Sequence, residues 1–362
     1  MGTLYQLDPI LQTPGLAADR PVRITERAVK ARQGAQQRLP ITIVEDEPER
    51  MVFMGDVHGD ITAFQDCLEV AGLIDEEGAW AGGTTVLVQL GDIFDRGDDD
   101  LAIEEWLFLL AEQAAEAGGA VYHLLGNHEL MNIMGDHSSA SKESFAPFVE
   151  LSPLVETWMN ENTALLEKVP KWAWPRLAAM RASGPVAHMM AGHSVAMKIG
   201  NTLVVHAGIL REHLEPQRCG GVTNGGVACL ELLNSVAANY LLNGGGMPQE
   251  MLWGRESPVW TRRYSMPDGK ALAKDAEEEL IAVLEATGSI RMVVGHTPQS
   301  AGINSAAQGK VWRVDTGMTK AIGGKPEVLE IRKGGEISIL TKAGRVSAEQ
   351  RSADTNKLTG WF

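Results

Sequence analysis

The chain has 362 residues, of which 44% are hydrophobic, and it carries 32 basic against 47 acidic residues for a net charge of −15 at pH 7. This composition is that of a folded globular protein and excludes a disordered chain. An acidic surface repels nucleic-acid phosphates, so we expect no nucleic-acid partner, although bound metal ions can reverse the charge locally and admit a phosphate substrate.

The cysteine count and the absence of long apolar runs bear on the cellular setting. Three cysteines, an odd number at low density, argue against a disulfide-rich secreted scaffold. Cys219 and Cys229 lie close together among glycines and are interpreted as free thiols, with a redox-sensitive pair as the alternative. We find no apolar run of about 18 residues and no signal-peptide core. A soluble, cytoplasmic protein without a membrane partner is therefore expected, and the oligomeric state stays open.

The first half of the chain predicts strands that alternate with helices. Residues 1–50 contain scattered prolines and predict an extended N-terminal arm, with a possible first strand at 41–44. Three short apolar runs then each end in a tight polar turn: Met51–Met54, Thr84–Leu90 and Ala120–Leu125. Helical spacing of apolar residues lies between them, at Ile61–Ala71 and Ile103–Ala117. This alternation favours parallel βαβ units, in which ligands bind at the carboxyl ends of the strands.

The second half begins with a segment of different composition. Residues 136–190 are rich in Trp, Met, Ala and Pro and predict a helical insert or cap, whose Trp158, Trp172 and Trp174 we assign to the core. The rest predicts a hairpin around Gly200-Asn201, helices at 227–241 and 273–286, a strand at 290–294 and a late β region at 311–340. We therefore expect one main domain over 51–345 and a C-terminal tail over 346–362.

Metal-binding side chains follow the first three apolar runs. Gly55-Asp56-Val57-His58-Gly59 places a carboxylate and an imidazole in one strand-end turn, where they can chelate a divalent ion. Asp92 occupies the same position in Gly91-Asp92-Ile93-Phe94-Asp95-Arg96-Gly97, where its carboxylate can bridge two ions and Arg96 offers a donor fork to a phosphate. Gly126-Asn127-His128-Glu129 supplies an amide oxygen and a potential proton donor.

Two later histidines complete this set. His206 and His296 each end an apolar strand next to a glycine, and we assign both as ligands. Nitrogen and oxygen ligands without thiolates suit Mn, Fe or Zn. A carboxylate that bridges two such ions is typical of two-metal phosphoryl hydrolysis. Among the other histidines, His123 is assigned to the core, His137 and His213 to solvated loops, and His193 is a minor candidate for an approach to the site.

The order GDVHG, GDIFDRG, GNHE, HAG and GHT resembles the calcineurin-like metallophosphoesterases over residues 50–320. It is most similar to the phosphoprotein phosphatase branch, and within it to the Shewanella-like protein phosphatases. Leu124-Leu125 stands where the eukaryotic serine/threonine phosphatases carry an Arg, and 314–318 reads Val-Asp-Thr-Gly-Met in place of their Ser-Ala-Pro-Asn-Tyr. The resemblance implies an α/β fold of two mixed β-sheets sandwiched between helices, with a helical insert.

The same resemblance implies a role for each motif residue. Two divalent ions, manganese first with iron or zinc as alternatives, would be held by Asp56, His58 and His296 on one side and Asn127 and His206 on the other, with Asp92 between them. Arg96 and a loop arginine, Arg262 in preference to Arg255, would bind the substrate phosphate. His128, steadied by Asp95, would protonate the leaving group after attack of a hydroxide that bridges the metals.

Three functions are compatible with these motifs. The first is a protein phosphatase that acts on a phosphoprotein or phosphopeptide, with phospho-Tyr and phospho-Ser/Thr both open. The second is a small-molecule phosphoesterase such as a symmetrical dinucleoside tetraphosphatase, and the pairing of Asp95 with His128 favours the first over it. The third is a metal-bound scaffold without turnover, which would require the loss of a catalytic residue, and none is missing.

Overall fold

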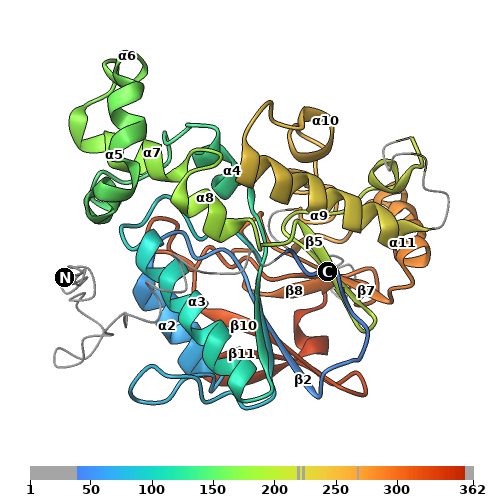
Figure 1. The fold of residues 1–362 in the computed structure, drawn as a ribbon. Helices are drawn as coiled ribbons and strands as arrows, with labels where there is room; N and C mark the ends of the chain where they lie inside the picture. Colours follow the sequence, from blue (N-terminus) through green and yellow to red (C-terminus); the bar gives the residue numbers. More distant parts are fainter. Residues whose placement is uncertain (1–38, 218–220, 222–224, 267–268, 355–362) are drawn as a thin grey trace, which may run out of the picture.

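A computed structural model of the chain describes residues 39–217, 221, 225–266 and 269–354. Two six-stranded mixed sheets form its centre, with helices on their outer sides (Figure 1). This arrangement is the α/β sandwich that the sequence predicts. Within these ranges no helix is both long and apolar enough to cross a membrane.

One sheet, in the order β12-β11-β10-β2-β3-β4, carries the first three motifs. Its strands β2, β3 and β4 are parallel, whereas β10, β11 and β12 continue the sheet in antiparallel fashion. The strands are β2 (Arg50–Met54), β3 (Val86–Gln89), β4 (Ala120–His123), β10 (Glu327–Arg332), β11 (Ile337–Thr341) and β12 (Gly344–Ser347). The three predicted apolar runs are thus confirmed as neighbouring strands.

The other sheet has the order β1-β5-β6-β7-β9-β8. The predicted hairpin is confirmed, because β5 and β6 pair in antiparallel fashion, and β7 and β9 then continue the sheet parallel to β6. The strands are β1 (Ile43–Val44), β5 (Ala196–Ile199), β6 (Thr202–Val205), β7 (Arg291–Val294), β8 (Asn304–Ala306) and β9 (Val311–Arg313).

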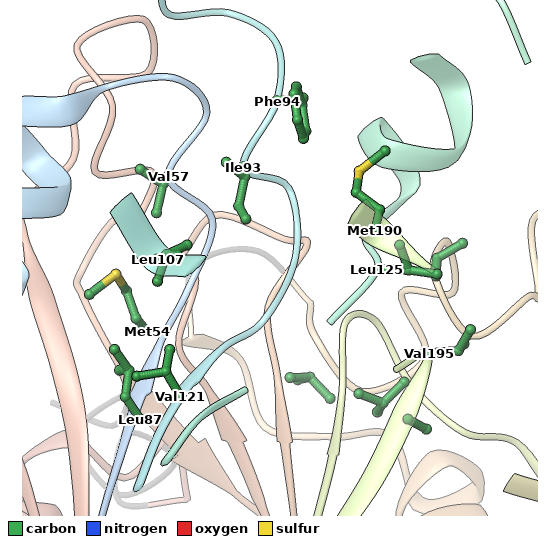
Figure 2. Packing of buried hydrophobic residues seen from close by; sticks show 14 of the residues in the cluster. Met54, Val57, Leu87, Ile93, Phe94, Leu107, Val121, Leu125, Met190 and Val195 are labelled. Atoms are coloured by element: carbon green, nitrogen blue, oxygen red, sulfur yellow. The ribbon is translucent and has the colours of Figure 1, made fainter. Parts of the chain in front are cut away.

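Alternation of side chains along the strands builds the core on both faces of each sheet. In β2, Met51 and Phe53 pack between the two sheets, whereas Val52 and Met54 face the helices. Figure 2 shows Met54 grouped with Leu87 and Val121, the outward residues of the neighbouring parallel strands. The strand ends are therefore held from both sides, which fixes the turns that follow them.

Helices cover the outer faces of the sandwich. Helices α2 (Ile61–Val70) and α3 (Asp100–Glu116) lie over the first sheet, and α9 (Gly226–Asn243) packs on β5 and on α11 (Lys274–Thr287). Outside the segment between α4 and β5, the structure also describes α4 (Asn127–Ile133), α10 (Gln249–Leu252) and the short 3₁₀ helices η3 (Arg211–Leu214) and η5 (Ala348–Arg351). The predicted helices at 61–71, 103–117, 227–241 and 273–286 are confirmed as α2, α3, α9 and α11, with ends that agree to within a few residues.

The segment between α4 and β5 is helical, as predicted, and projects from the sandwich (green in Figure 1). It contains η1 (Glu143–Leu151), α5 (Ser152–Glu161), α6 (Thr163–Leu166), η2 (Lys171–Ala173), α7 (Trp174–Met180) and α8 (Pro185–Met190). The assignment of the three tryptophans to the core is confirmed for Trp158, which packs against it, but Trp174 is only half-buried and Trp172 is 47% exposed. A projecting layer of short helices has only one face to bury.

The ends of the described chain differ in detail from the expected arm and tail. The strand β1 joins the sheet through β5, so part of the arm belongs to the sandwich. The expected boundary at residue 345 falls inside β12, and the backbone N–H of Ala353 donates to the carbonyl of Ser305 at 2.7 Å. Residues 346–353 are therefore attached to the sheets.

Candidate metal centre and active site

The carboxyl ends of parallel strands from both sheets bring the motif side chains together. Asp56 follows β2, Asp92 follows β3, Asn127 follows β4, His206 follows β6 and His296 follows β7. All five side chains are buried, together with that of His58. Six polar side chains thus meet in one place at the top of the sandwich, although the motifs that supply them are spread over most of the chain.

The carboxylate of Asp92 lies at the centre of this set. Its Oδ2 is 3.4 Å from Nε2 of His206, 3.7 Å from Nε2 of His58 and 3.9 Å from Nε2 of His128. The single oxygen therefore faces imidazoles that belong to both sheets. This is the position that a carboxylate shared by two ions would occupy.

Hydrogen bonds on the far side of two rings fix which nitrogen faces Asp92. Nδ1 of His58 donates to the carbonyl of Phe94 at 3.0 Å, and Nδ1 of His206 donates to the carbonyl of Leu90 at 2.7 Å. Since a carbonyl can only accept, the proton of each ring lies on Nδ1 when the ring is neutral, and its Nε2 lone pair then faces the carboxylate. Lone pairs directed at a carboxylate oxygen repel it unless a cation lies between them, so the geometry fits a metal ion.

The ring of His296 lies on a different side of the centre from the one expected. Its Nδ1 is 2.9 Å from Oδ1 of Asn127, and the same amide oxygen is 3.2 Å from Nε2 of His206. The side-chain ligand atoms of Asp92, His206 and His296 converge. The imidazole therefore groups with Asn127 and His206 rather than with His58, and only the backbone N–H of His296 contacts Asp56, at 3.1 Å.

The electrostatics of the centre also favour cations. Burial, Asp315 and Asp92 raise the pKa of Asp56 well above its usual value. Burial lowers the pKa of His58 to about 4 and that of His296 to about 3, so both rings are neutral near pH 7. Crowded carboxylates and neutral imidazoles form a donor set of nitrogen and oxygen that suits Mn, Fe or Zn.

His128 is held differently from the other imidazoles. Its Nδ1–H donates to Oδ2 of Asp95 at 2.6 Å, and its Nε2 lies 3.4 Å from Nη2 of Arg96. Burial lowers its pKa, but the charge of Asp92 and the bond to Asp95 outweigh burial and raise the pKa of His128 above its ordinary value. The raised pKa favours the protonated form of this buried ring, as a general acid requires.

Glu129 joins two of the motifs. Its buried carboxylate accepts hydrogen bonds from the backbone N–H groups of Gly126, Asp92 and Ile93 at 2.7 to 2.8 Å. The turn after β3 is therefore fastened to the turn after β4, which fixes Asp92 relative to Asn127. Glu129 is part of the Gly126-Asn127-His128-Glu129 motif. Its role depends on the contact with the turn after β3, which the spacing of the motifs in the sequence does not reveal.

The backbone at the centre is in a rare conformation. Five of the eight non-glycine residues with positive φ in the described ranges lie in the site: His58, Asp92, Asp95, Arg96 and His296. Such a conformation costs about 1–3 kcal/mol for each residue and is held by its surroundings. Gly59 and Gly97 contribute, because a Cβ on either would overlap the backbone of the other and push the two motif turns apart.

The candidate phosphate ligands face solvent beside the centre. Arg96 is exposed near His128, and Nε of exposed Arg262 lies 3.4 Å from Oγ1 of Thr297, the residue after His296. A cavity of about 1080 Å³ adjoins it and is lined in part by Trp253, Arg255, Glu256, Trp260, Arg262 and Lys270. The ring of Trp260 lies 5.7 Å from that of His296, which connects the cavity to the centre.

Arg176 of α7 is the residue that the sequence did not indicate. Its fully buried guanidinium donates to Asp100 at 2.8 Å, to Asn132 at 2.8 Å and to Asp95 at 3.3 Å. The expectation that His137 is solvated is wrong, because it is half-buried and bonded to Asn132 at 2.7 Å in the same network. The helical insert thereby supports the carboxylate that orients His128.

Asp315 was not assigned to the site from the sequence, although its position in the sequence indicates it. It follows β9 as the other acidic residues follow their strands, and it is buried beside Asp56. Burial raises its pKa to about 6. Asp56 and Asp92 were selected because each directly follows a predicted strand, and the same criterion would have selected Asp315.

Comparisons with known proteins identify the family of the chain. Residues 49–314 match the family model of calcineurin-like phosphoesterases. Shewanella-like protein phosphatase 2 of Arabidopsis thaliana is 32% identical over 324 residues, covering 82% of this chain and 78% of the relative. An uncharacterized protein of Schizosaccharomyces pombe is 30% identical over 81% of this chain and 80% of its own length. The fold is similar to a cold-active protein-tyrosine phosphatase of a Shewanella species, with a TM-score of 0.65, 23% identity and coverage of 86% of this chain and 83% of that one.

Proposed function

Because the chain belongs to the calcineurin-like phosphoesterase family and is a metal-dependent phosphatase related to the Shewanella-like protein phosphatases, we propose that it hydrolyses phosphomonoesters on phosphoproteins or phosphopeptides. The observation that carries the proposal is the carboxylate of Asp92, which faces the Nε2 lone pairs of His58 and His206. The relative named as a protein phosphatase favours this substrate class over dinucleoside polyphosphates.

The residues divide into two ligand sets that share Asp92. Asp56 and His58 would hold one divalent ion, and Asn127, His206 and His296 the other, with His296 reassigned because its ring lies 2.9 Å from Asn127. Manganese is the first candidate, with iron or zinc as alternatives. When bound, the ions supply positive charge that activates the attacking water and stabilises the phosphoryl group in the transition state.

The exposed arginines would bind and orient the phosphate. Arg96 lies in the turn of Asp92, and Arg262 is tied to Thr297 at 3.4 Å, so both flank the metal ligands. Arg255 and Arg263 line the same cavity, and Arg263 forms an ion pair with Asp275 at 2.7 Å. A planar guanidinium offers paired donors to phosphate oxygens, and Arg262 is the better placed second ligand.

His128 would move the proton. Asp95 accepts from its Nδ1, which fixes the ring with Nε2 at 3.4 Å from Nη2 of Arg96. From there Nε2 would donate to the leaving-group oxygen of a phosphate bound by Arg96. The raised pKa of His128 favours its protonated form. General acid catalysis of this kind contributes about 10²–10⁴-fold to the rate.

The substrate class is tested by one comparison. The manganese-loaded protein would be assayed side by side on phosphotyrosine peptides, phosphothreonine peptides and a dinucleoside tetraphosphate. We expect turnover of at least one peptide class well above that of the nucleotide. Preferential hydrolysis of the dinucleoside tetraphosphate would overturn the protein phosphatase proposal and leave the metal centre intact.

A further inference from the structure

A second cluster of ligand-type side chains lies outside the proposed catalytic set. Glu104 comes from α3, His123 is the last residue of β4, and His193 lies between α8 and β5. All three are buried, and the carboxylate of Glu104 is 0% exposed. None of them contacts the phosphate arginines or supplies a ligand to the proposed dinuclear centre, so the cluster needs its own explanation.

The three ligand atoms are spaced like those around a single ion. Nδ1 of His123 lies 3.0 Å from Nε2 of His193, which lies 3.1 Å from Oε1 of Glu104. Nδ1 of His123 lies 3.9 Å from Oε2 of the same carboxylate. Ligands at zinc distances of about 2.0–2.2 Å in a tetrahedron stand about 3.3 Å apart. The observed separations bracket this value.

Protons alone do not satisfy all three contacts. If Nε2 of His193 carries a proton, that single hydrogen must serve both Glu104 and His123. If His123 carries the proton instead, Nε2 of His193 accepts it and then presents a lone pair to the carboxylate. A proton on each nitrogen would set two N–H groups against one another at 3.0 Å. A cation is the one centre to which all three lone pairs can point.

The charge of the cluster leads to the same conclusion. Within the described ranges, the two imidazoles are the only basic groups at ion-pair distance from this carboxylate. A buried carboxylate beside two neutral rings carries a net charge of −1, which attracts a cation.

The backbone holds the ligands in place before any ion binds. Leu124 and Ser194, the residues after the two histidines, pair with each other in an isolated bridge between the two sheets. The N–H of Ser194 donates to the carbonyl of His123 at 3.2 Å, and the N–H of Leu125 donates to that of Ser194 at 2.9 Å. Helix α3 packs on β4 and adds Glu104. Such a preformed ligand set lowers the cost of binding a metal.

We propose that Glu104, His123 and His193 bind a divalent transition-metal ion, with zinc as the best match to two imidazoles and one carboxylate. This third ion is structural. It fastens the end of the helical insert to α3 and to the edge of the first sheet, at the seam where β4 and β5 meet.

Metal stoichiometry of the whole protein tests the proposal. Chelator-stripped protein is dialysed against Zn²⁺, and bound metal is counted by elemental analysis. We expect three equivalents in the wild type, two in Glu104→Gln and in His193→Gln, and three in the control His188→Gln, which removes an exposed histidine of α8. The same count in the wild type and both cluster variants would contradict the third site.

Two further measurements separate this inference from the proposed function. In the double variant Asp92→Asn, His206→Asn, the dinuclear centre is disabled, and we expect one equivalent to remain. Loss of all metal there contradicts the third site, whereas retention of three equivalents contradicts the dinuclear centre. Anomalous scattering at the zinc edge from Zn²⁺-soaked wild-type crystals avoids variants altogether. A peak among the three side chains supports the site, and its absence when the dinuclear centre is filled overturns it.

Discussion

Nη2 of Arg176 lies 3.3 Å from Oδ1 of Asp95, although 81 residues separate the two in the sequence. Oδ2 of the same carboxylate accepts from Nδ1 of His128. The helical insert therefore reaches the proposed general acid through one intervening side chain. Both partners are fully buried, so the contact belongs to the interior of the protein rather than to its surface.

Replacement of Arg176 by Met should destabilise the protein. Asp95 and Asp100 would lose a buried cationic partner, and breaking a buried pair costs about 3–5 kcal/mol. Chemical denaturation measures this loss. Arg181→Met is the matched control, because Arg181 belongs to the same insert but bonds to Ser183 and Ala182 instead. Equal stability of the two variants would contradict the role given to Arg176.

Replacement of His128 by Asn should slow hydrolysis mainly of esters with poor leaving groups. We expect a loss of about 10²–10⁴-fold on an alkyl phosphate and a smaller loss on an activated aryl phosphate, whose leaving group needs less protonation. Turnover numbers on both substrates measure the difference. The metal content should be unchanged, and equal losses on the two substrates would count against His128 as the proton donor.

Removal of metal should abolish activity. The ligands of the dinuclear centre are carboxylates, an amide and neutral imidazoles, which cannot activate water alone at the required rate. Protein dialysed against a chelator should be inactive, and Mn²⁺ should restore turnover in a titration followed by a phosphate-release assay. Full activity in excess chelator would exclude the proposed mechanism.

The arginines can be ranked by phosphate affinity. Arg96→Ala and Arg262→Ala should each weaken the binding of vanadate or inorganic phosphate about tenfold to a hundredfold, because each charged set of hydrogen bonds contributes about 1.5–3 kcal/mol. Isothermal titration measures the change. Arg263→Ala is the control, since Asp275 already holds that side chain. A larger effect in Arg255→Ala than in Arg262→Ala would transfer the role to Arg255.

The pair Cys219 and Cys229 yields a prediction about redox chemistry. Cys229 is disulfide-bonded, so its interpretation as a free thiol is wrong. Cys219 lies outside the described residues, so a reversible, redox-sensitive pairing of the two stays a prediction. Oxidation with diamide should then produce a linked peptide by mass spectrometry and change turnover, and both effects should be absent in Cys219→Ser. Cys67 should stay unmodified, because it is buried and burial raises the pKa of its thiol. Detection of free thiols only would remove the hypothesis.

The sequence predicts the strands and the metal ligands because both depend on local pattern. An apolar run followed by Gly-Asp or Gly-Asn identifies the end of a parallel strand, and those ends meet by the topology of the sheet. The pattern does not assign each ring to an ion. His58 and Asn127 both follow strands of the first sheet, whereas His296 follows β7 of the second sheet. The spacing of the motifs does not reveal how the two sheets are placed against each other, and this placement brings His296 to Asn127.

The buried charged residues around the two clusters could not be predicted from the local sequence pattern. Arg176 and Glu104 stand within helices, where a charged residue is ordinarily solvated, and only tertiary packing buries them against partners 81 and 89 residues away, at Asp95 and His193. Trp172 shows the converse, because a large apolar residue in a thin projecting layer stays partly outside. Whether these side chains are buried therefore depends on tertiary packing, which composition and periodicity do not predict.

The positive φ angles of His58, Asp92, Asp95, Arg96 and His296 have a consequence for directed evolution. Glycine adopts this conformation without the penalty that every other residue bears, so glycine at any of these five positions would relieve backbone strain. Each such change would also delete a ligand or a catalytic group. Glycine at Asp95 would also break the buried pair with Arg176 and would not be selected. At the other four positions, selection for thermal stability alone would favour inert proteins, and only simultaneous screening for turnover would retain the centre.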